Sequence, residues 1–275
     1  MVAFVLGGGG QLGAHEVGML RALLERGIVP DVVVGTSVGA INGAAVASEP
    51  SVAMAERLGQ TWSDLERSDV FGGSLLRRLG TLARTGTHLH GNETLRATLT
   101  EALPVALIED LPVRFECVAA SIEAAAEHWF TAGPLVDAVL ASAAVPGLLP
   151  PVEVDGEHFI DGGIVNSIPV DRAVQLGATR VFVMHVGRID RPLAPPRWPW
   201  EVGLVAFEIA RRHRFLGDLA SLPDSVDVHV LPTGQPEPPR YNDLSALRYR
   251  VSAGVGESIE RALAASRAYL QERGL

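Results

Sequence analysis

The sequence predicts an α/β fold with three layers, in which helices cover both faces of a mainly parallel central sheet. Wholly apolar runs such as Val32–Val34 are typical of strands buried on both faces, and stretches of helical periodicity alternate with them. At 275 residues, 47% of them hydrophobic, the chain is long enough to bury one large core. We therefore expect a single domain over 1–275, with the motif-bearing core in 1–186 and a helical and strand extension over 187–275.

The first fifty residues predict a strand–helix–strand–helix unit. Val2–Leu6 is a short apolar strand, and apolar side chains recur at helical spacing over Ala14–Arg26. Val32–Val34 is the second strand, and Ala40–Ala47 is a helix of small residues that can lie close to a sheet. Because crossover connections of this kind are right-handed, the two strands should be parallel.

The later elements follow from the same two periodicities, and the sequence contains no internal repeat. Helices are expected over 51–65, 74–83, 93–103, 134–145 and 169–176, after the proline-rich stretch 192–199, and over 244–270. Strands are expected over 113–119, 128–131, 159–160, 180–186 and 226–231.

A G-x-S-x-G turn, Gly35-Thr36-Ser37-Val38-Gly39, joins the second strand to the helix of small residues. A serine on such a strand-to-helix turn has its hydroxyl exposed above the sheet, where it can attack a carbonyl. Gly35 and Gly39 remove the Cβ atoms that would collide where strand and helix meet. The motif predicts Ser37 as a nucleophile, and the alternative is a glycine-rich turn with an idle serine.

Asp161 stands at the end of Glu157-His158-Phe159-Ile160, is followed by Gly162-Gly163, and is the candidate base. A carboxylate in contact with a serine hydroxyl can accept its proton if burial raises the proton affinity of the carboxylate. The alternative is a serine–histidine–acid triad, which needs a histidine after the serine. The candidates for it are His185 and, after it, His213 and His229.

The glycine run at the end of the first strand, which includes Gly8, Gly9 and Gly10, is the candidate oxyanion hole. Backbone amides of such a loop approach a substrate closely, and the following helix dipole favours negative charge. The same run, continued to Gly13, also fits the dinucleotide fingerprint G-x-G-x-x-G. That alternative needs an acidic residue at the end of the second strand, where this chain has Gly35-Thr36-Ser37.

Together these blocks resemble the patatin-like phospholipases, a family that uses a serine–aspartate dyad without a catalytic histidine. The match covers roughly residues 1–186, and the order and spacing of its blocks make it specific. It includes Ala141–Gly147, which runs into Pro150-Pro151, and it includes Asn166 and Pro169 after the aspartate turn. The resemblance implies the family's three-layer fold for this chain.

Carried over residue by residue, the resemblance implies Ser37 as the nucleophile and Asp161 as the base. It implies an oxyanion hole at Gly8, Gly9 and Gly10, support of the elbow and the dyad by Gly35, Gly39, Gly162 and Gly163, and no metal or organic cofactor. The family commonly has a basic residue where this chain has Gln11-Leu12. The oxyanion would therefore depend on backbone amides, and a preference for an anionic phosphate headgroup is not implied.

We expect a hydrolase that cleaves fatty-acyl esters of lipids, phospholipids included, through an acyl-enzyme on Ser37. Two alternatives stay open at this point. An acyltransferase or a thioesterase would use the same acyl-enzyme with another acceptor or donor. A catalytically silent lipid-binding protein would keep the fold without the reaction.

Composition limits the other classes of partner. The net charge of −9 argues against nonspecific nucleic-acid binding and against global attraction to anionic membranes, which leaves transient local contact with lipid. The single cysteine, Cys117, allows no internal disulfide and is expected to be a buried hydrophobe. His88 and His90 lack the further ligands that a metal site needs. Without a signal peptide or a bilayer-length apolar segment, we expect a cytoplasmic protein.

The stretch that follows Trp198-Pro199-Trp200 predicts an amphipathic helix with basic residues, Arg211-Arg212-His213-Arg214, towards its end. Such a helix can dock on a lipid surface or act as a lid over a site. The favoured interpretation is a packed helix with a solvated basic patch.

Overall fold

The computed structural model describes residues 1–67, 88, 90–186, 192–235 and 254–275. Its sheet has the strand order β5-β6-β3-β2-β1-β7-β8, and β4 pairs with β3 off this path. The strands are β1 (Val2–Leu6), β2 (Val32–Thr36), β3 (Arg114–Ser121), β4 (Ala126–Phe130), β5 (Val152–Val154), β6 (Glu157–Asp161), β7 (Arg180–Met184) and β8 (Asp227–Val230). The helices are α1 (Ala14–Glu25), α2 (Val38–Ser48), α3 (Val52–Arg67), α5 (Glu93–Ala102), α6 (Leu135–Ser142), α7 (Val170–Gln175), α8 (Pro199–Ser221) and α9 (Val255–Glu272).

The sheet is mainly parallel, as the sequence predicts. Strands β3, β2, β1, β7 and β8 are paired in parallel, in that order. Strands β4 and β6 pair with β3 antiparallel, and β5 pairs with β6 antiparallel. The carboxyl ends of β1 and β2 are neighbours, so the glycine loop and the serine turn that follow them meet at one edge of the sheet.

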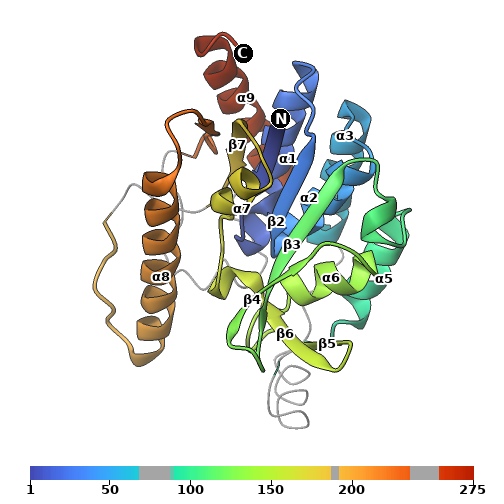
Figure 1. The fold of residues 1–275 in the computed structure, drawn as a ribbon, viewed down its shortest axis with the longest axis vertical. Helices are drawn as coiled ribbons and strands as arrows, with labels where there is room; N and C mark the ends of the chain where they lie inside the picture. The colour runs from blue at the N-terminus through green and yellow to red at the C-terminus, as the bar shows by residue number, and fades with distance from the viewer. Residues whose placement is uncertain (68–87, 89, 187–191, 236–253) are drawn as a thin grey trace.

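Helices cover both faces of the sheet. Phe4 and Leu6 of β1 belong to a core that includes buried residues of α1, α2 and α9, whereas Ala3 and Val5 belong to a second core with α7 and Phe215 of α8. This alternation along β1 is the period of two that a strand imposes. Figure 1 shows α7 and α8 on one side of the sheet and α3 and α5 on the other. The α/β/α architecture is therefore confirmed.

The predicted strands and helices that fall in the described ranges are confirmed, with small shifts at their ends. The helix expected over 74–83 lies outside the described residues, as does the first part of the one expected over 244–270. Strand β5 was not predicted. Within the described ranges, no helix combines the length and the apolar character that a bilayer span requires.

Candidate active site

The serine of the G-x-S-x-G turn occupies a strained position between β2 and α2. Ser37 has φ 56° and ψ −124°, a conformation that residues with a side chain rarely adopt. The turn passes so close to β1 that a Cβ on Gly39 would lie 2.2 Å from the Leu6 carbonyl oxygen. This geometry agrees with the predicted nucleophile elbow at the carboxyl end of the sheet.

Asp161 meets Ser37 because of the register of the sheet. Strand β3 pairs Val118 with Thr36 of β2, and its next residue, Ala119, pairs with Asp161 of β6. The Ser37 Oγ donates a hydrogen bond to the Asp161 Oδ2 over 2.5 Å, across 124 positions of sequence. Both side chains are buried, with residue exposures of 5% and 6%. The two residues that the sequence analysis paired are therefore in direct contact.

Asp161 is a buried carboxyl group whose second oxygen also has a partner. Its Oδ1 accepts a hydrogen bond from the Gly163 amide over 2.7 Å, and the Asp161 backbone amide donates a hydrogen bond to the Ala144 carbonyl. Burial raises the pKa of Asp161 from 3.8 to about 6, against the opposing effect of the hydrogen bonds from Ser37 and Gly163. The carboxyl group is ionised at neutral pH but holds a proton more tightly than an exposed aspartate does.

A second serine fixes the backbone of the elbow. The hydroxyl of Ser142, at the end of α6, accepts a hydrogen bond from the Ser37 amide over 2.9 Å and donates one to the Val118 carbonyl over 2.7 Å. Thr36 donates its hydroxyl to the Asn166 carbonyl, over 2.8 Å, in the segment that follows β6. The elbow is thus bonded to β3 and to the aspartate turn through buried hydroxyl groups.

The glycine loop between β1 and α1 lies beside the elbow. A Cβ on Gly8 would lie 3.5 Å from the Ser37 Cβ, so the backbone of the loop passes next to the serine. The Gly8 amide donates a hydrogen bond to the Ser167 carbonyl over 2.8 Å, so it is not free to bind an oxyanion in this arrangement. No described residue accepts the amide of Gly9 or Gly10 in a hydrogen bond. We therefore narrow the predicted oxyanion donors to Gly9 and Gly10.

A buried polar network behind the glycine loop was not anticipated from the sequence. Asn42 of α2 donates to the Glu16 Oε2 over 2.7 Å and to the Gly13 carbonyl over 3.0 Å. Its own side-chain oxygen accepts the Trp62 indole N–H over 3.0 Å. Burial raises the pKa of Glu16 well above its usual value, which disfavours the negative charge of this carboxyl group. The glycine loop in front of it is the one that we expect to stabilise an oxyanion.

An apolar pocket opens beside Ser37. It is lined by one face of each of α2, α3 and α5 and by the segment that follows α6, and both Ser37 and Gly10 belong to its lining. The other polar side chains of the lining are those of Thr61, His90 and Thr98. The sequence predicts α3 and α5 as helices, but nothing in their periodicity assigns them to a site.

The histidines named as alternative bases, and the single cysteine, have contacts of their own. His185 is buried after β7, with its ring centroid 6.2 Å from that of Phe215. His229 contacts a carboxylate of its own strand over 2.8 Å, and His213 is exposed on α8. Cys117 is fully buried, and burial raises the pKa of its thiol. In the part of the chain that the structure describes, no three His, Cys, Asp or Glu side chains gather as a metal site.

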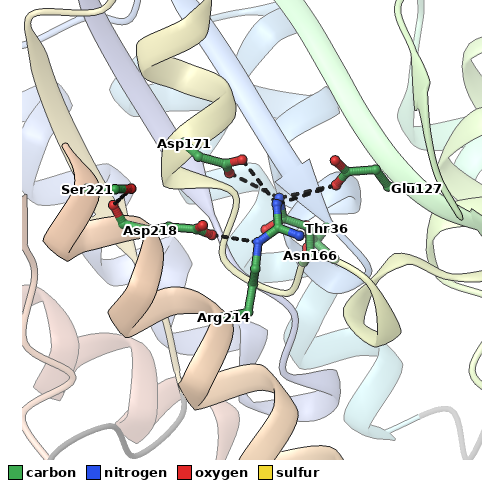
Figure 2. Close-up of polar contacts among 7 residues, drawn as sticks. All are labelled: Thr36, Glu127, Asn166, Asp171, Arg214, Asp218 and Ser221. Atoms are coloured by element: carbon green, nitrogen blue, oxygen red, sulfur yellow. Dashed lines mark hydrogen bonds and ion pairs between the residues drawn. The ribbon is translucent and has the colours of Figure 1, made fainter.

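Figure 2 shows how Arg214 joins α8 to α7 and β4. Its guanidinium lies 2.8 Å from Asp218 of α8, 3.1 Å from Asp171 of α7 and 3.7 Å from Glu127 of β4. The Asn166 amide group donates to Asp171 over 3.0 Å and to Glu127 over 3.4 Å. This ion-pair cluster therefore extends from α8 to the segment that follows the aspartate turn.

The basic run of α8 is not the solvated patch that we expected, because its arginines form ion pairs. Arg211 and Arg212 both contact Glu208, over 3.1 and 3.3 Å, and the guanidinium of Arg211 is buried. Phe215 packs into the core beneath the helix. Large apolar side chains are exposed at the start of α8 and along it, namely Trp198 at the N-cap and Val202, Phe207, Ile209 and Leu216 in the helix. A lid or a lipid contact at α8 stays a prediction.

We expect Arg214→Met to lower the melting temperature. The change leaves three carboxylates together without their cation, which should cost about 1–3 kcal/mol of unfolding free energy at pH 8, since the pairs are partly exposed. Burial raises the pKa of Asp218, and protonation of this carboxylate relieves part of the repulsion, so the deficit should shrink as the pH is lowered from 8 to 5. Thermal unfolding across this range measures it. Arg57→Met, which removes an exposed pair with Glu49, is the control, and equal losses in both variants would contradict the account.

The chain matches a family model and several known proteins. Residues 4–174 match the family model described as patatin-like phospholipase. The chain is 34% identical over 191 residues to patatin-like phospholipase domain-containing protein 7 of Rattus norvegicus, and 31% identical over 191 residues to neuropathy target esterase sws of Drosophila melanogaster. It is 32% identical over 197 residues to lysophospholipase nte1 of Aspergillus terreus. The crystal structure of VipD from Legionella pneumophila is similar with a TM-score of 0.49 and 14% identity, over 98% of this chain and 66% of that one.

The three curated relatives are much longer than this chain. Each match covers 69% of this chain but only 14%, 13% and 12% of the respective relative, so the matched part spans about one eighth to one seventh of their length. The matched region contains the glycine loop, the elbow and the aspartate turn. Because the family model matches more than half of the chain, and relatives above 30% identity match more than two thirds of it, the chain belongs to the patatin-like phospholipase family.

Proposed function

We propose that this protein is a serine acyl hydrolase that cleaves fatty-acyl esters of lipids, phospholipids included, with Ser37 as the nucleophile and Asp161 as the general base. The observation that carries the proposal is the 2.5 Å hydrogen bond from the Ser37 hydroxyl to the buried Asp161 carboxylate. A nucleophile within hydrogen-bond reach of its base is the arrangement that acyl transfer requires. Membership of a phospholipase family supports a lipid ester as the substrate.

The reaction begins with the serine. The Ser37 Oγ attacks the ester carbonyl while its proton passes to the Asp161 Oδ2, and the carbonyl oxygen becomes an oxyanion. The amides of Gly9 and Gly10, together with the positive end of the α1 dipole, stabilise this charge. The carbon–oxygen bond to the alcohol then breaks, and the alcohol leaves with the proton that Asp161 holds.

A water molecule completes the cycle. Asp161 takes a proton from this water as its oxygen attacks the acyl-enzyme carbonyl, and a second oxyanion forms against the same amides. When the bond to the Ser37 Oγ breaks, the proton on Asp161 returns to the serine and the fatty acid is released. The pKa of about 6 suits both directions of transfer, because the carboxylate is ionised at neutral pH and still has appreciable proton affinity.

Covalent labelling tests the nucleophile. We expect a fluorophosphonate probe to label the protein, because the activated Ser37 hydroxyl attacks phosphorus as it attacks a carbonyl, and peptide mapping should find the adduct on Ser37. Ser63, a partly buried hydroxyl on α3, is an internal control and should stay unlabelled. A folded protein that hydrolyses no ester and takes no label at Ser37 would favour a silent lipid-binding protein instead.

The pH dependence of activity tests the base. Asp161 accepts a proton only when ionised, and its raised pKa predicts that kcat/KM for an uncharged short-chain ester rises with pH, with a midpoint near pH 6. An aspartate with an ordinary pKa would place that midpoint near pH 4. Because an ordinary histidine titrates in a similar range, the profile is also measured for His185→Ala. An unchanged midpoint in that variant agrees with Asp161 as the base, and loss of the acid limb contradicts it.

A further inference from the structure

The pocket beside Ser37 has a direction, which the surrounding helices define. Helix α2 begins at the elbow, and Ser142 at the end of α6 bonds to the Ser37 amide, so one end of each helix lies there. Along α2, the lining residues Ile41 and Ala45 follow Ser37 at intervals of one helical turn. The lining therefore extends from the serine along α2 for two turns, or about 12 Å.

Helix α5 runs in the same direction on the opposite wall. Just before it, the His90 amide donates to the carbonyl of Leu148, in the segment that leaves α6 at the elbow. Just after it, Leu103 lines the pocket, and Ala106 accepts the amide of Leu135 at the far end of α6. The start of α5 therefore lies near the elbow. The end of α5 lies at the far end of the pocket, away from Ser37.

Helix α3 returns antiparallel to α2 and forms the third wall. Trp62, near its end, bonds to Asn42 in the first turns of α2, whereas Leu58 lies one turn earlier and further from the elbow. Thr61 and Thr98 are the hydroxyl-bearing residues among the lining of α3 and α5. Walls of this composition fit a hydrocarbon chain and offer little to a polar headgroup.

We propose that this pocket binds the acyl chain of the substrate along α2, and that Ala45 at its far end sets the preferred chain length. The inference rests on the proposed function, because the chain points along α2 only if its ester carbonyl lies at the Ser37 Oγ. An extended chain advances about 1.2 Å per bond, so a length of about 12 Å accommodates about ten carbon atoms. Carbon atoms beyond that number leave the apolar walls.

A series of p-nitrophenyl esters tests the preferred length. From butanoate to decanoate, kcat/KM should rise about twofold or more with each added carbon, because each further methylene becomes buried. From decanoate to tetradecanoate it should stay level or fall. All substrates are used below the concentrations at which they aggregate. A rise that continues unchanged to tetradecanoate would overturn the proposal.

Ala45→Leu tests the residue. The leucine side chain reaches about two bonds further than alanine, so the optimum should move from decanoate to octanoate. The ratio of kcat/KM for decanoate to that for octanoate should fall about tenfold, because a methylene that does not fit is costly in a shaped pocket. Ala53→Leu is the matched control, since Ala53 is exposed on α3 and outside the lining. A ratio that changes equally in both variants would contradict the assignment of Ala45.

A binding measurement separates this inference from the proposed function. In the Ser37→Ala background, free fatty acids compete with a fluorescent fatty acid, and affinity should increase up to decanoic acid and then level off. Ala45→Leu in that background should weaken the binding of decanoic acid more than the binding of octanoic acid. If no ester is hydrolysed but binding follows this pattern, the proposed function fails and the pocket assignment stands. If hydrolysis depends on Ser37 but neither assay depends on chain length or on residue 45, the pocket assignment fails alone.

Discussion

Asp161→Asn is expected to lower kcat for ester hydrolysis by about 10³-fold or more, because the amide cannot accept the Ser37 proton. The change is nearly isosteric, and the new side-chain oxygen can still accept the Gly163 amide, so the turn should keep its shape. KM should change little, because the substitution removes an interaction needed in the transition state rather than one that binds the substrate. Initial rates with a short-chain ester measure both quantities.

The stability of Asp161→Asn should change in the opposite sense to its activity. In the folded protein the pKa of Asp161 is about 6, against 3.8 as its ordinary value, so burial of the ionised form destabilises the native state above pH 6. Removing the charge should therefore raise the unfolding free energy at pH 8 by an amount on the order of 3 kcal/mol. This gain should disappear below pH 4, where the carboxyl group is protonated in both states.

His185→Ala is the matched control for Asp161→Asn. If His185→Ala abolishes turnover in a folded protein while Asp161→Asn retains it, the base has been wrongly assigned and a triad replaces the dyad. Activity that survives both changes would remove Asp161 from the mechanism. Thermal unfolding of each variant shows whether a loss of rate comes from loss of structure.

Ser37→Ala is expected to reduce ester hydrolysis by about 10⁴-fold or more, because the change removes the hydroxyl on which we expect the acyl-enzyme to form. The same change removes the hydroxyl that bonds to a buried carboxylate, so Asp161 loses a charge-stabilising partner. We expect a loss of about 1–3 kcal/mol of unfolding free energy at pH 8, with a smaller loss at pH 4. Steady-state assays and thermal unfolding of one preparation measure both effects.

Ser37→Ala and Asp161→Asn are therefore expected to have opposite effects on stability and the same effect on turnover. In the double variant Ser37→Ala with Asp161→Asn, the stability loss of the serine change should largely vanish, because no buried charge is left without its partner. Additive stability changes in the double variant would mean that the two side chains do not interact in solution. Wild-type turnover by Ser37→Ala would exclude this residue as the nucleophile.

The sequence predicts the centre of this fold well because local patterns specify it. The apolar run Val32–Val34 in β2, the helical period of α1 and the glycines of the elbow each restrict the chain within a few residues. The contact between Ser37 and Asp161 depends instead on the pairing of β3 with both β2 and β6, which no local pattern contains. The order and spacing of the motifs, rather than periodicity, predict that Ser37 and Asp161 act together.

Other features of the site escape the sequence for physical reasons. Strand β5 is only three residues long, although the Asp155-Gly156 turn after it, with positive φ at both residues, is a recognisable hairpin signal. The engagement of the Gly8 amide depends on a carbonyl of a distant segment. The bond between Glu16 and Asn42 joins two helices whose polar residues look isolated in the sequence. Tertiary packing decides each of these.

In the proposed reaction, Ser37 carries the acyl group between attack and release. Mass spectrometry of the protein, quenched during turnover of a p-nitrophenyl ester, tests it most directly. We predict a mass increase equal to the acyl group, located on the peptide that contains Ser37, and absent from Ser37→Ala under the same conditions. Turnover with the acyl group on another residue, or an equal adduct in Ser37→Ala, would contradict the account.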